Sequence, residues 1–449
     1  MSAFDKIIGY ENIKEELKWY SDILKNPAYY EKLGVNGPNG LLLYGDPGVG
    51  KSMMAKALIA ESGCKAYTLR KNLPNGDFVK EIKRIFDGAA ENSPSIVLLD
   101  DVDKFANCDY SNKDAEEYVT IQACMDEYKG KDVFVVATAN DRYYLPDSLL
   151  RPGRFDKLIN VGLPNREESA QIIDYYLKSK AIDVDVDSKE ISRLIAGNSC
   201  AALENVINEA GIMAAYQKKP LIQREDIINA CIRFIYGAPI VSDIKNIENA
   251  ELTALHEAGH VVVAEILQPG SVHVAYLGNG NGSMRGFAAI QRKNAGFYDF
   301  EGEEFGILHT LGGKAAVEVI KGKKAVGCGS DMEDVFQDVR NLVENECAFG
   351  MEGYTFGRFG SDRSTNRMEE IVLREVKRYY EQTKKIITEN RLFVGAVMAA
   401  LLEKRIVTGK EIAVIRESLT EENRRLAKEY YIDDLRNDIL NNIKDINGI

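Results

Sequence analysis

The sequence predicts a multidomain protein in which an α/β domain and a small helical lid are followed by a mostly α-helical domain. Its 449 residues exceed what one compact core usually holds. Between Gly40 and Leu163, short apolar runs alternate with helix-like stretches, which is typical of a three-layer α/β domain. After Arg166 the strand pattern stops and helical periodicity takes over.

The expected strands of the first domain are nearly all apolar, as in a parallel sheet that is buried on both faces. They are Leu41–Tyr44, Ile96–Leu99, Val133–Ala137 and Leu158–Val161. The helices expected between them are Lys51–Ser62, Asp77–Glu91 and Asp114–Tyr128. The lid is expected to contain the helices Glu167–Lys178, Ser188–Ala196, Ala202–Gln217 and Gln223–Ile235.

The second domain has a different pattern of expected elements, in which long helices flank one glycine-rich patch. Its expected helices are Glu251–Leu267, Phe305–Lys321, Ser330–Phe349, Asn366–Asn390 and Arg391–Lys404, and the patch Gly278–Gly286 predicts turns among short strands. We therefore expect the α/β domain at 1–162, a lid at 163–237, a linker at 238–250, the helical domain at 251–420 and a charged helical tail at 421–449.

Composition excludes several classes of function. A formal net charge of −12 gives a surface that repels phosphate backbones, so we expect no nucleic-acid partner. Seven scattered cysteines without a C-x-x-C pair indicate a reducing cytoplasm. Because no apolar run approaches the roughly 18–20 residues of a membrane span, we expect a soluble, cytoplasmic chain, or one that is membrane-anchored only as part of a longer protein.

The most specific motif of the first domain is a phosphate-binding loop between a strand and a helix. It fits G-x-x-x-x-G-K-[ST] and consists of Gly45, Asp46, Pro47, Gly48, Val49, Gly50, Lys51 and Ser52. The glycines let backbone N–H groups surround phosphate oxygens at a helix N-terminus. Lys51 supplies a positive charge and Ser52 a hydroxyl for Mg²⁺.

Three further segments in the expected order support nucleotide hydrolysis. The strand Ile96–Leu99 ends in Asp100 and Asp101, where the first carboxylate can hold Mg²⁺ and the second can polarise a water. The next strand ends in Thr138 and Asn140, a polar pair suited to sensing a γ-phosphate. Arg151 and Arg154 follow and can stabilise transition-state charge, also in trans in an oligomer.

A second constellation opens the helical domain. His256, Glu257 and His260 form an H-E-x-x-H motif, and positions i and i+4 of a helix share one face, so both imidazoles can reach one Zn²⁺. Glu257 lies beside that face and can take a proton from the attacking water.

A catalytic zinc needs a third protein ligand. Spacing alone does not choose among the candidates, which are His273, His309, Glu318 and Asp331. Cys328 lies near Asp331 in the sequence, but a lone thiol usually behaves as a small apolar side chain.

Together these motifs resemble the FtsH-type ATP-dependent zinc metalloproteases of the AAA+ class. The resemblance covers nearly the whole chain. It begins at Phe4–Lys14, continues through the phosphate-binding loop, LLDD, VVATAN, LLRPGRFD, Asn208-Glu-Ala210, HEAGH, LGGKAA and GSDMED, and fades near Leu419.

The resemblance implies a role for each site residue. His256, His260 and Asp331 would be the zinc ligands and Glu257 the general base. Arg151 and Arg154 would reach the ATP of a neighbouring subunit, and Asn140 would be the first sensor. The implied cofactors are ATP, Mg²⁺ and Zn²⁺, and the implied assembly is a homo-hexamer of ATPase and protease rings.

Three features depart from the family pattern. Two membrane helices usually come first, whereas Phe4 already matches the ATPase domain. Asp101 stands where the family has glutamate, so we expect slower turnover. The segment Arg70–Val79 lacks the aromatic–hydrophobic–glycine step of the pore loop, and its one aromatic, Phe78, fits the core equally well.

We therefore predict an ATP-dependent zinc metalloendopeptidase that unfolds, translocates and degrades unfolded or loosely folded proteins and peptides. One alternative is an ATP-driven remodelling factor with weak or lost proteolysis, suggested by Asp101 and the altered pore segment. Another is an ATP-regulated peptidase that acts on short peptides.

Overall fold

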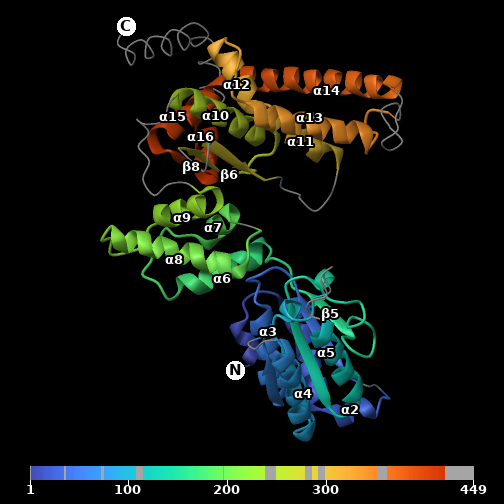
Figure 1. Cartoon of the computed structure of the whole chain (residues 1–449). Coiled ribbons are helices and arrows are strands. Elements are labelled where there is room, and N and C mark those ends of the chain that lie inside the picture. Colours follow the sequence, from blue (N-terminus) through green and yellow to red (C-terminus); the bar gives the residue numbers. More distant parts are fainter. Residues whose placement is uncertain are drawn as a thin grey trace. The chain divides into compact units, whose positions relative to one another are not determined.

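The computed structural model describes residues 2–34, 37–71, 75–107, 115–195, 197–237, 249–278, 286–291, 299–350 and 362–419. The chain divides into two compact units, Met1–Cys231 and Ile232–Ile449 (Figure 1). The expected linker at 238–250 lies largely outside the described residues, as does the expected tail at 421–449. No described helix is both long and apolar enough to cross a membrane.

A five-stranded parallel sheet forms the centre of the first unit, with strand order β2-β3-β4-β1-β5. Its strands are β1 (Gly40–Tyr44), β2 (Lys65–Leu69), β3 (Ser95–Leu99), β4 (Val133–Ala139) and β5 (Lys157–Asn160). The four expected strands are confirmed. The edge strand β2 was not expected from the sequence, because only Leu69 of its five residues is buried.

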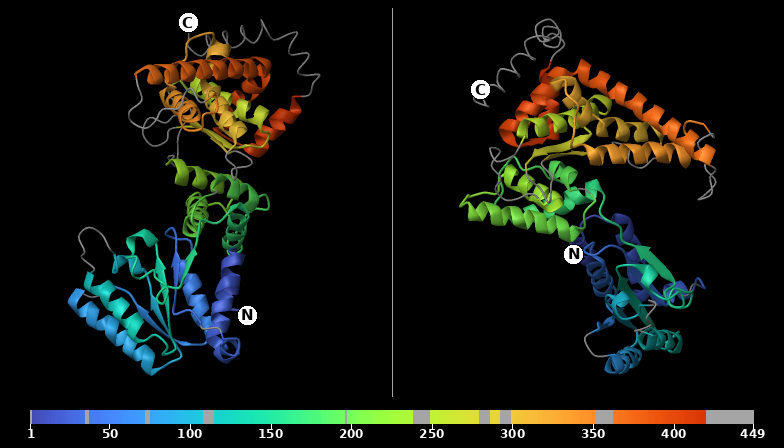
Figure 2. Two further views of the ribbon diagram at one scale, coloured as in Figure 1. Left: turned by 90° about the vertical axis from the view of Figure 1, so that its right-hand side faces the viewer. Right: turned by 45° about the horizontal axis from the view of Figure 1, so that its top comes forward.

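Helices cover both faces of this sheet. They are α1 (Glu11–Lys25), α2 (Pro27–Glu31), α3 (Lys51–Ser62), α4 (Asn75–Glu91) and α5 (Ala115–Glu127), with 3₁₀ turns at Ala3–Lys6, Val102–Lys104 and Arg142–Tyr144. The left view of Figure 2 shows α4 and α5 on one side of the strands and the darker blue helices on the other. Phe78 on α4 is fully buried and stands edge-on to Phe105, so it belongs to the core.

A helical subdomain completes the first unit. It comprises α6 (Arg166–Leu177), α7 (Ser188–Leu194), α8 (Cys200–Tyr216) and α9 (Arg224–Tyr236), the last of which runs across the division between the units. Asn165 and Ser199 cap α6 and α8 with their side chains, as polar residues do at helix starts. Tyr10 near the N-terminus donates its backbone N–H to Glu168 at 2.8 Å, which ties the start of the chain to α6.

The second unit packs its helices around α10, whose inner face lies in the hydrophobic core. The helices are α10 (Ala250–Leu267), α11 (Phe300–Thr310), α12 (Gly312–Lys321), α13 (Gly329–Glu344), α14 (Asp362–Glu389), α15 (Arg391–Lys404) and α16 (Gly409–Ser418). The strands β6 (Val272–Leu277), β7 (Gly286–Ile290) and β8 (Ile406–Thr408) form an antiparallel sheet in the order β7-β6-β8.

One expected helix of this unit is wrong. The stretch Phe305–Lys321 forms two helices, α11 and α12, which meet at Leu311. The break brings Gly312 and Gly313 to the first turn of α12, and both glycines lie against α10.

Candidate functional site

The phosphate-binding loop connects β1 to α3 and is shaped by its glycines. Gly45, Gly48 and Gly50 all have positive φ angles, of 147°, 81° and 98°. A side chain at Gly45 would also collide with the carbonyl oxygen of Val161, 2.0 Å from the Cβ position. The loop therefore needs glycine at these positions in order to fold into its turn ahead of the N-terminus of α3.

The lysine of this loop points back onto the loop. Lys51 Nζ donates to the carbonyl oxygens of Gly45 at 2.7 Å and Asp46 at 2.8 Å, and to Asn140 Oδ1 at 3.1 Å. The side chain is buried, and burial lowers its pKa. Asn140, which follows β4, therefore lies beside the loop as the sequence predicts.

The two carboxylates that follow β3 have different surroundings. Asp100 is buried, accepts hydrogen bonds from Ser52 Oγ at 2.8 Å and Thr138 Oγ1 at 2.7 Å, and also binds Arg70. Burial acts to raise the pKa of Asp100, but these hydrogen bonds outweigh it and hold the pKa below its usual value. Asp101 is half-exposed, has a φ of 58°, and pairs with Lys104 Nζ at 2.7 Å.

Sequence reasoning missed a third carboxylate at this edge of the sheet. Asp103 Oδ2 accepts the backbone N–H of Asn140 at 3.1 Å, while its Oδ1 is buried without a hydrogen-bond partner. The carboxylate of Asp103 also interacts electrostatically with Lys51, so its unpartnered oxygen belongs to the surroundings of the phosphate-binding loop. The acidic run Asp100-Asp101-Val102-Asp103 carried this signal, but spacing alone could not show that Asp103 turns toward Asn140.

The structure does not bring the two predicted arginines onto the loop. Arg154 binds Asp126 through Nη2 at 2.8 Å and Nε at 3.1 Å, and also donates to the carbonyl of Ser148. Arg151 is exposed. Both residues lie on the turn before β5, and Arg154 is paired there with Asp126.

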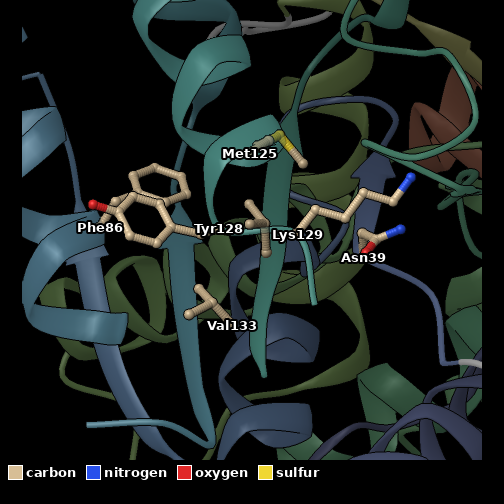
Figure 3. Close-up of a pocket in the computed structure, with 7 residues that line it drawn as sticks. Asn39, Phe86, Met125, Tyr128, Lys129 and Val133 are labelled. Carbon is tan, nitrogen blue, oxygen red and sulfur yellow. The ribbon is translucent and has the colours of Figure 1, made fainter. Parts of the chain in front are cut away.

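A small pocket in this unit lies away from the predicted chemistry (Figure 3). It is lined by Asn39, Phe86, Met125, Tyr128, Lys129, Val133 and Val135. Asn39 precedes β1 and Val133 begins β4, so the pocket lies at the amino ends of the strands. The phosphate-binding loop follows the carboxyl end of β1, at the opposite edge of the sheet, where ligands of open α/β sheets bind.

In the second unit, three predicted ligands converge. His256 and His260 lie on α10, and Asp331 lies in the first turn of α13. His256 Nε2 is 3.1 Å from His260 Nε2 and 3.1 Å from Asp331 Oδ2, and His260 Nε2 is 3.5 Å from the same oxygen. All three ligand atoms lie within 4.8 Å of one another, and Asp331 Oδ2 is a buried oxygen without a hydrogen-bond partner, so the donor set fits a metal ion.

Surrounding groups orient these ligands. His260 Nδ1 lies 2.8 Å from the backbone carbonyl of His309, which can only accept, so Nδ1 carries the proton and Nε2 is free to bind a metal. Burial acts to raise the pKa of Asp331, but the neighbouring His256 and His260 outweigh it and lower that pKa. Glu257 is buried next to the two histidines, and burial raises its pKa.

The other candidates for the third ligand are engaged elsewhere. His273 Nε2 contacts Gln291 Oε1 at 3.0 Å, and His309 contributes its carbonyl rather than its ring. Both oxygens of Glu318 are bonded, one to Lys314 Nζ at 3.0 Å and one to the Tyr380 hydroxyl at 2.6 Å. Among the described residues, the cluster that could hold a metal is therefore the one that includes Asp331.

Sequence reasoning missed one residue of this site because it carries no side chain. A Cβ on Gly313 would lie 2.5 Å from both His256 Cε1 and His260 Nε2. The two imidazoles thus occupy the space that any other residue at 313 would fill. The pair Gly312-Gly313 in the sequence was the available signal.

Comparison with known proteins gives matches to both units. Residues 41–163 match the ATPase family associated with various cellular activities (AAA), and residues 244–415 match peptidase family M41. A protein of Caldicellulosiruptor bescii named ATP-dependent zinc metalloprotease FtsH is 30% identical over 91% of this chain and 71% of its own length. Proteins of the same name from Kosmotoga olearia (30% identical, 92% and 68%) and Mycoplasma mobile (28% identical, 98% and 67%) match similarly.

Proposed function

The chain belongs to the FtsH family of ATP-dependent zinc metalloproteases, and from this premise we propose which residues carry its two activities and how it assembles. It is an enzyme that joins an AAA ATPase domain to an M41 peptidase domain. Its cofactors are ATP with Mg²⁺ and a zinc ion, and its substrates are proteins.

In the peptidase domain, His256, His260 and Asp331 would hold zinc, and their convergence beside Glu257 is the observation that carries this assignment. Bound zinc would polarise the scissile carbonyl and lower the pKa of the attacking water. The His309 carbonyl keeps the proton of His260 on Nδ1. Glu257 takes a proton from the attacking water and passes it to the leaving amine, a role suited to a carboxylate whose pKa is raised by burial.

In the ATPase domain, the loop Gly45–Ser52 would surround the phosphates. Lys51 would exchange its hydrogen bonds to the loop carbonyls for contacts with phosphate oxygens. Ser52 and Asp100 would hold Mg²⁺, and their 2.8 Å contact supports this pairing. Asp101 would orient the attacking water and Asn140 would contact the γ-phosphate. Arg151 and Arg154 would act on the ATP of a neighbouring copy.

We place this chemistry in a homo-hexamer that threads unfolded protein toward the peptidase sites. Family membership and the arginine pair support the ring, since an arginine of this kind can be supplied in trans. Residues 72–74 of the expected pore segment Arg70–Val79 lie outside the described residues.

The proposal is tested by degradation of a labelled unfolded protein in the presence of zinc with ATP, ADP or no nucleotide, using Glu257→Gln as the control. We expect loss of substrate with ATP and retention of substrate in the control. ATP hydrolysis without degradation in the unaltered enzyme would favour a remodelling factor. Equal cleavage of short peptides with and without ATP would favour an ATP-independent peptidase fused to a regulatory nucleotide-binding domain. Full activity of Glu257→Gln would overturn the assignment of the base.

A further inference from the structure

Arg70 lies beside the buried carboxylate of the ATPase site because of the sheet register. Strands β2 and β3 are parallel, with Leu69 opposite Leu99, and Asp100 N–H donates to the Leu69 carbonyl at 3.1 Å. Arg70 and Asp100 are therefore the residues that follow two paired strands at the same edge of the sheet. The backbones of these two residues are therefore close together whatever conformation the Arg70 side chain adopts.

The contacts of Asp100 use its full acceptor capacity. Oδ2 accepts Arg70 Nε–H at 2.8 Å and a second N–H from Arg70 Nη2. Oδ1 accepts the hydroxyls of Ser52 and Thr138 at 2.8 and 2.7 Å. A carboxylate offers about four lone-pair positions, and these four donors fill them.

Arg70 is in direct contact with the charge on Asp100, with which Lys51 also interacts electrostatically. The Asp100 side chain is 1% exposed, and a buried carboxylate without a counter-ion is strongly unfavourable. Lys51 hydrogen-bonds to loop carbonyls and Asn140, and Lys104 hydrogen-bonds to Asp101. The Arg70 side chain is 61% exposed, so it approaches from solvent and can swing back into water.

We propose that Arg70 holds Asp100 when no Mg²⁺ is bound and competes with hydrated Mg²⁺ for this carboxylate, so that it sets the Mg²⁺ concentration at which the site retains nucleotide. The inference builds on the proposed role of Asp100 at the Mg²⁺ position. Two cations at one carboxylate oxygen repel each other, and the low local dielectric near a buried group strengthens that repulsion. Arg70 must therefore leave Oδ2 as Mg²⁺ arrives.

The test uses the purified full chain and a fluorescent ADP derivative, titrated with Mg²⁺ after removal of metal by EDTA. The Arg70→Ala variant should reach half-maximal Mg²⁺-dependent binding at about tenfold lower Mg²⁺, since a hydrogen bond to a charged group is worth about that factor. Arg84→Ala is the matched control, because Arg84 pairs with Glu81 on the exposed face of α4 and should leave the titration unchanged. An unchanged or higher Mg²⁺ requirement in Arg70→Ala would overturn the inference.

Thermal unfolding supplies a second readout. Without metal, Arg70→Ala should melt at lower temperature than the unaltered chain, because Asp100 loses the cation paired with it. Mg²⁺ with ADP should remove this difference in melting temperature. Arg70→Lys, which keeps the charge but loses the paired N–H geometry, should fall between the two in the Mg²⁺ titration. Nucleotide binding that responds to Mg²⁺ equally in all variants would refute the role of Arg70 but would leave the proposed ATPase site standing. Failure of ADP to bind the unaltered chain would refute the proposed ATPase site as well.

Discussion

Gly259 and Gly312 lie backbone to backbone where α10 crosses α12. A Cβ on Gly259 would lie 2.3 Å from the Gly312 carbonyl oxygen, and a Cβ on Gly312 would lie 2.5 Å from the Gly259 carbonyl oxygen. Because Gly259 stands between the motif's Glu257 and His260, this crossing brings α12 directly against the metal-binding face of α10.

Gly259→Ala should destabilise the second unit. The added methyl group collides with backbone atoms of α12, which cannot rotate away, and overpacking of this kind costs about 1–3 kcal/mol. Chemical unfolding monitored by circular dichroism measures the change. Gly306→Ala in α11 is the control, because a Cβ there meets no atom within 4 Å, and it should be neutral or slightly stabilising.

Gly313→Ala should remove metal while leaving most of the fold intact. Its methyl group would enter the space of the His256 and His260 rings, which are side chains and can rotate away from the metal position. Zinc content after dialysis, measured by atomic absorption, should fall well below that of the unaltered chain, whereas the circular dichroism spectrum should change little. Full zinc occupancy would contradict the close packing of Gly313 on the imidazoles.

Asp331→Asn should also lower zinc content, because an amide is a far weaker zinc ligand than a carboxylate. Glu318→Gln is the matched carboxylate control, since Glu318 is bonded to Lys314 and Tyr380 and should leave zinc content unchanged. Chelation should lower the melting temperature of the unaltered chain and affect Asp331→Asn much less. If Glu318→Gln lost zinc and Asp331→Asn kept it, the ligand set would be wrong.

Glu375 should make the stability of the second unit depend on pH. Burial acts to raise its pKa, but hydrogen bonds from Arg378 and Arg374 outweigh it and hold the pKa below its usual value of 4.5. The pairing therefore stabilises the fold above that value, and the stabilisation is lost as pH falls through the lowered pKa. Glu375→Gln should be less stable than the unaltered chain at pH 7, and urea unfolding should show the gap closing toward pH 3.

The sequence predicted elements well wherever burial leaves a continuous apolar pattern. Strands β1, β3, β4 and β5 and helix α10 follow their expected ranges within about two residues. Strand β2 was not predicted because an edge strand with exposed faces leaves no apolar run in the sequence. The break at Leu311 was not predicted because helical periodicity continues across it. The contact of Gly312 with α10 accounts for the turn of the chain at this point.

The residues of the candidate sites likewise divide into those that local spacing predicts and those that only tertiary packing brings together. Motifs with fixed local spacing, such as the loop Gly45–Ser52 and the pair His256 and His260, could be predicted because one helix or turn positions all their members. The third ligand could not be chosen from spacing, since Asp331 reaches the histidines only through the packing of distant helices. The contact of Arg70 with Asp100 required the strand register, which the sequence does not reveal without β2.

The pairing of Arg154 with Asp126 has a consequence for how the enzyme is switched on. If Arg154 serves the ATP of a neighbouring copy, as proposed, an isolated copy keeps this arginine paired with Asp126 on its own surface. Ring formation must then exchange an internal ion pair for a contact between subunits. Hydrolysis would rise with protein concentration before any substrate is present, so a dilute pool of free copies would consume little ATP.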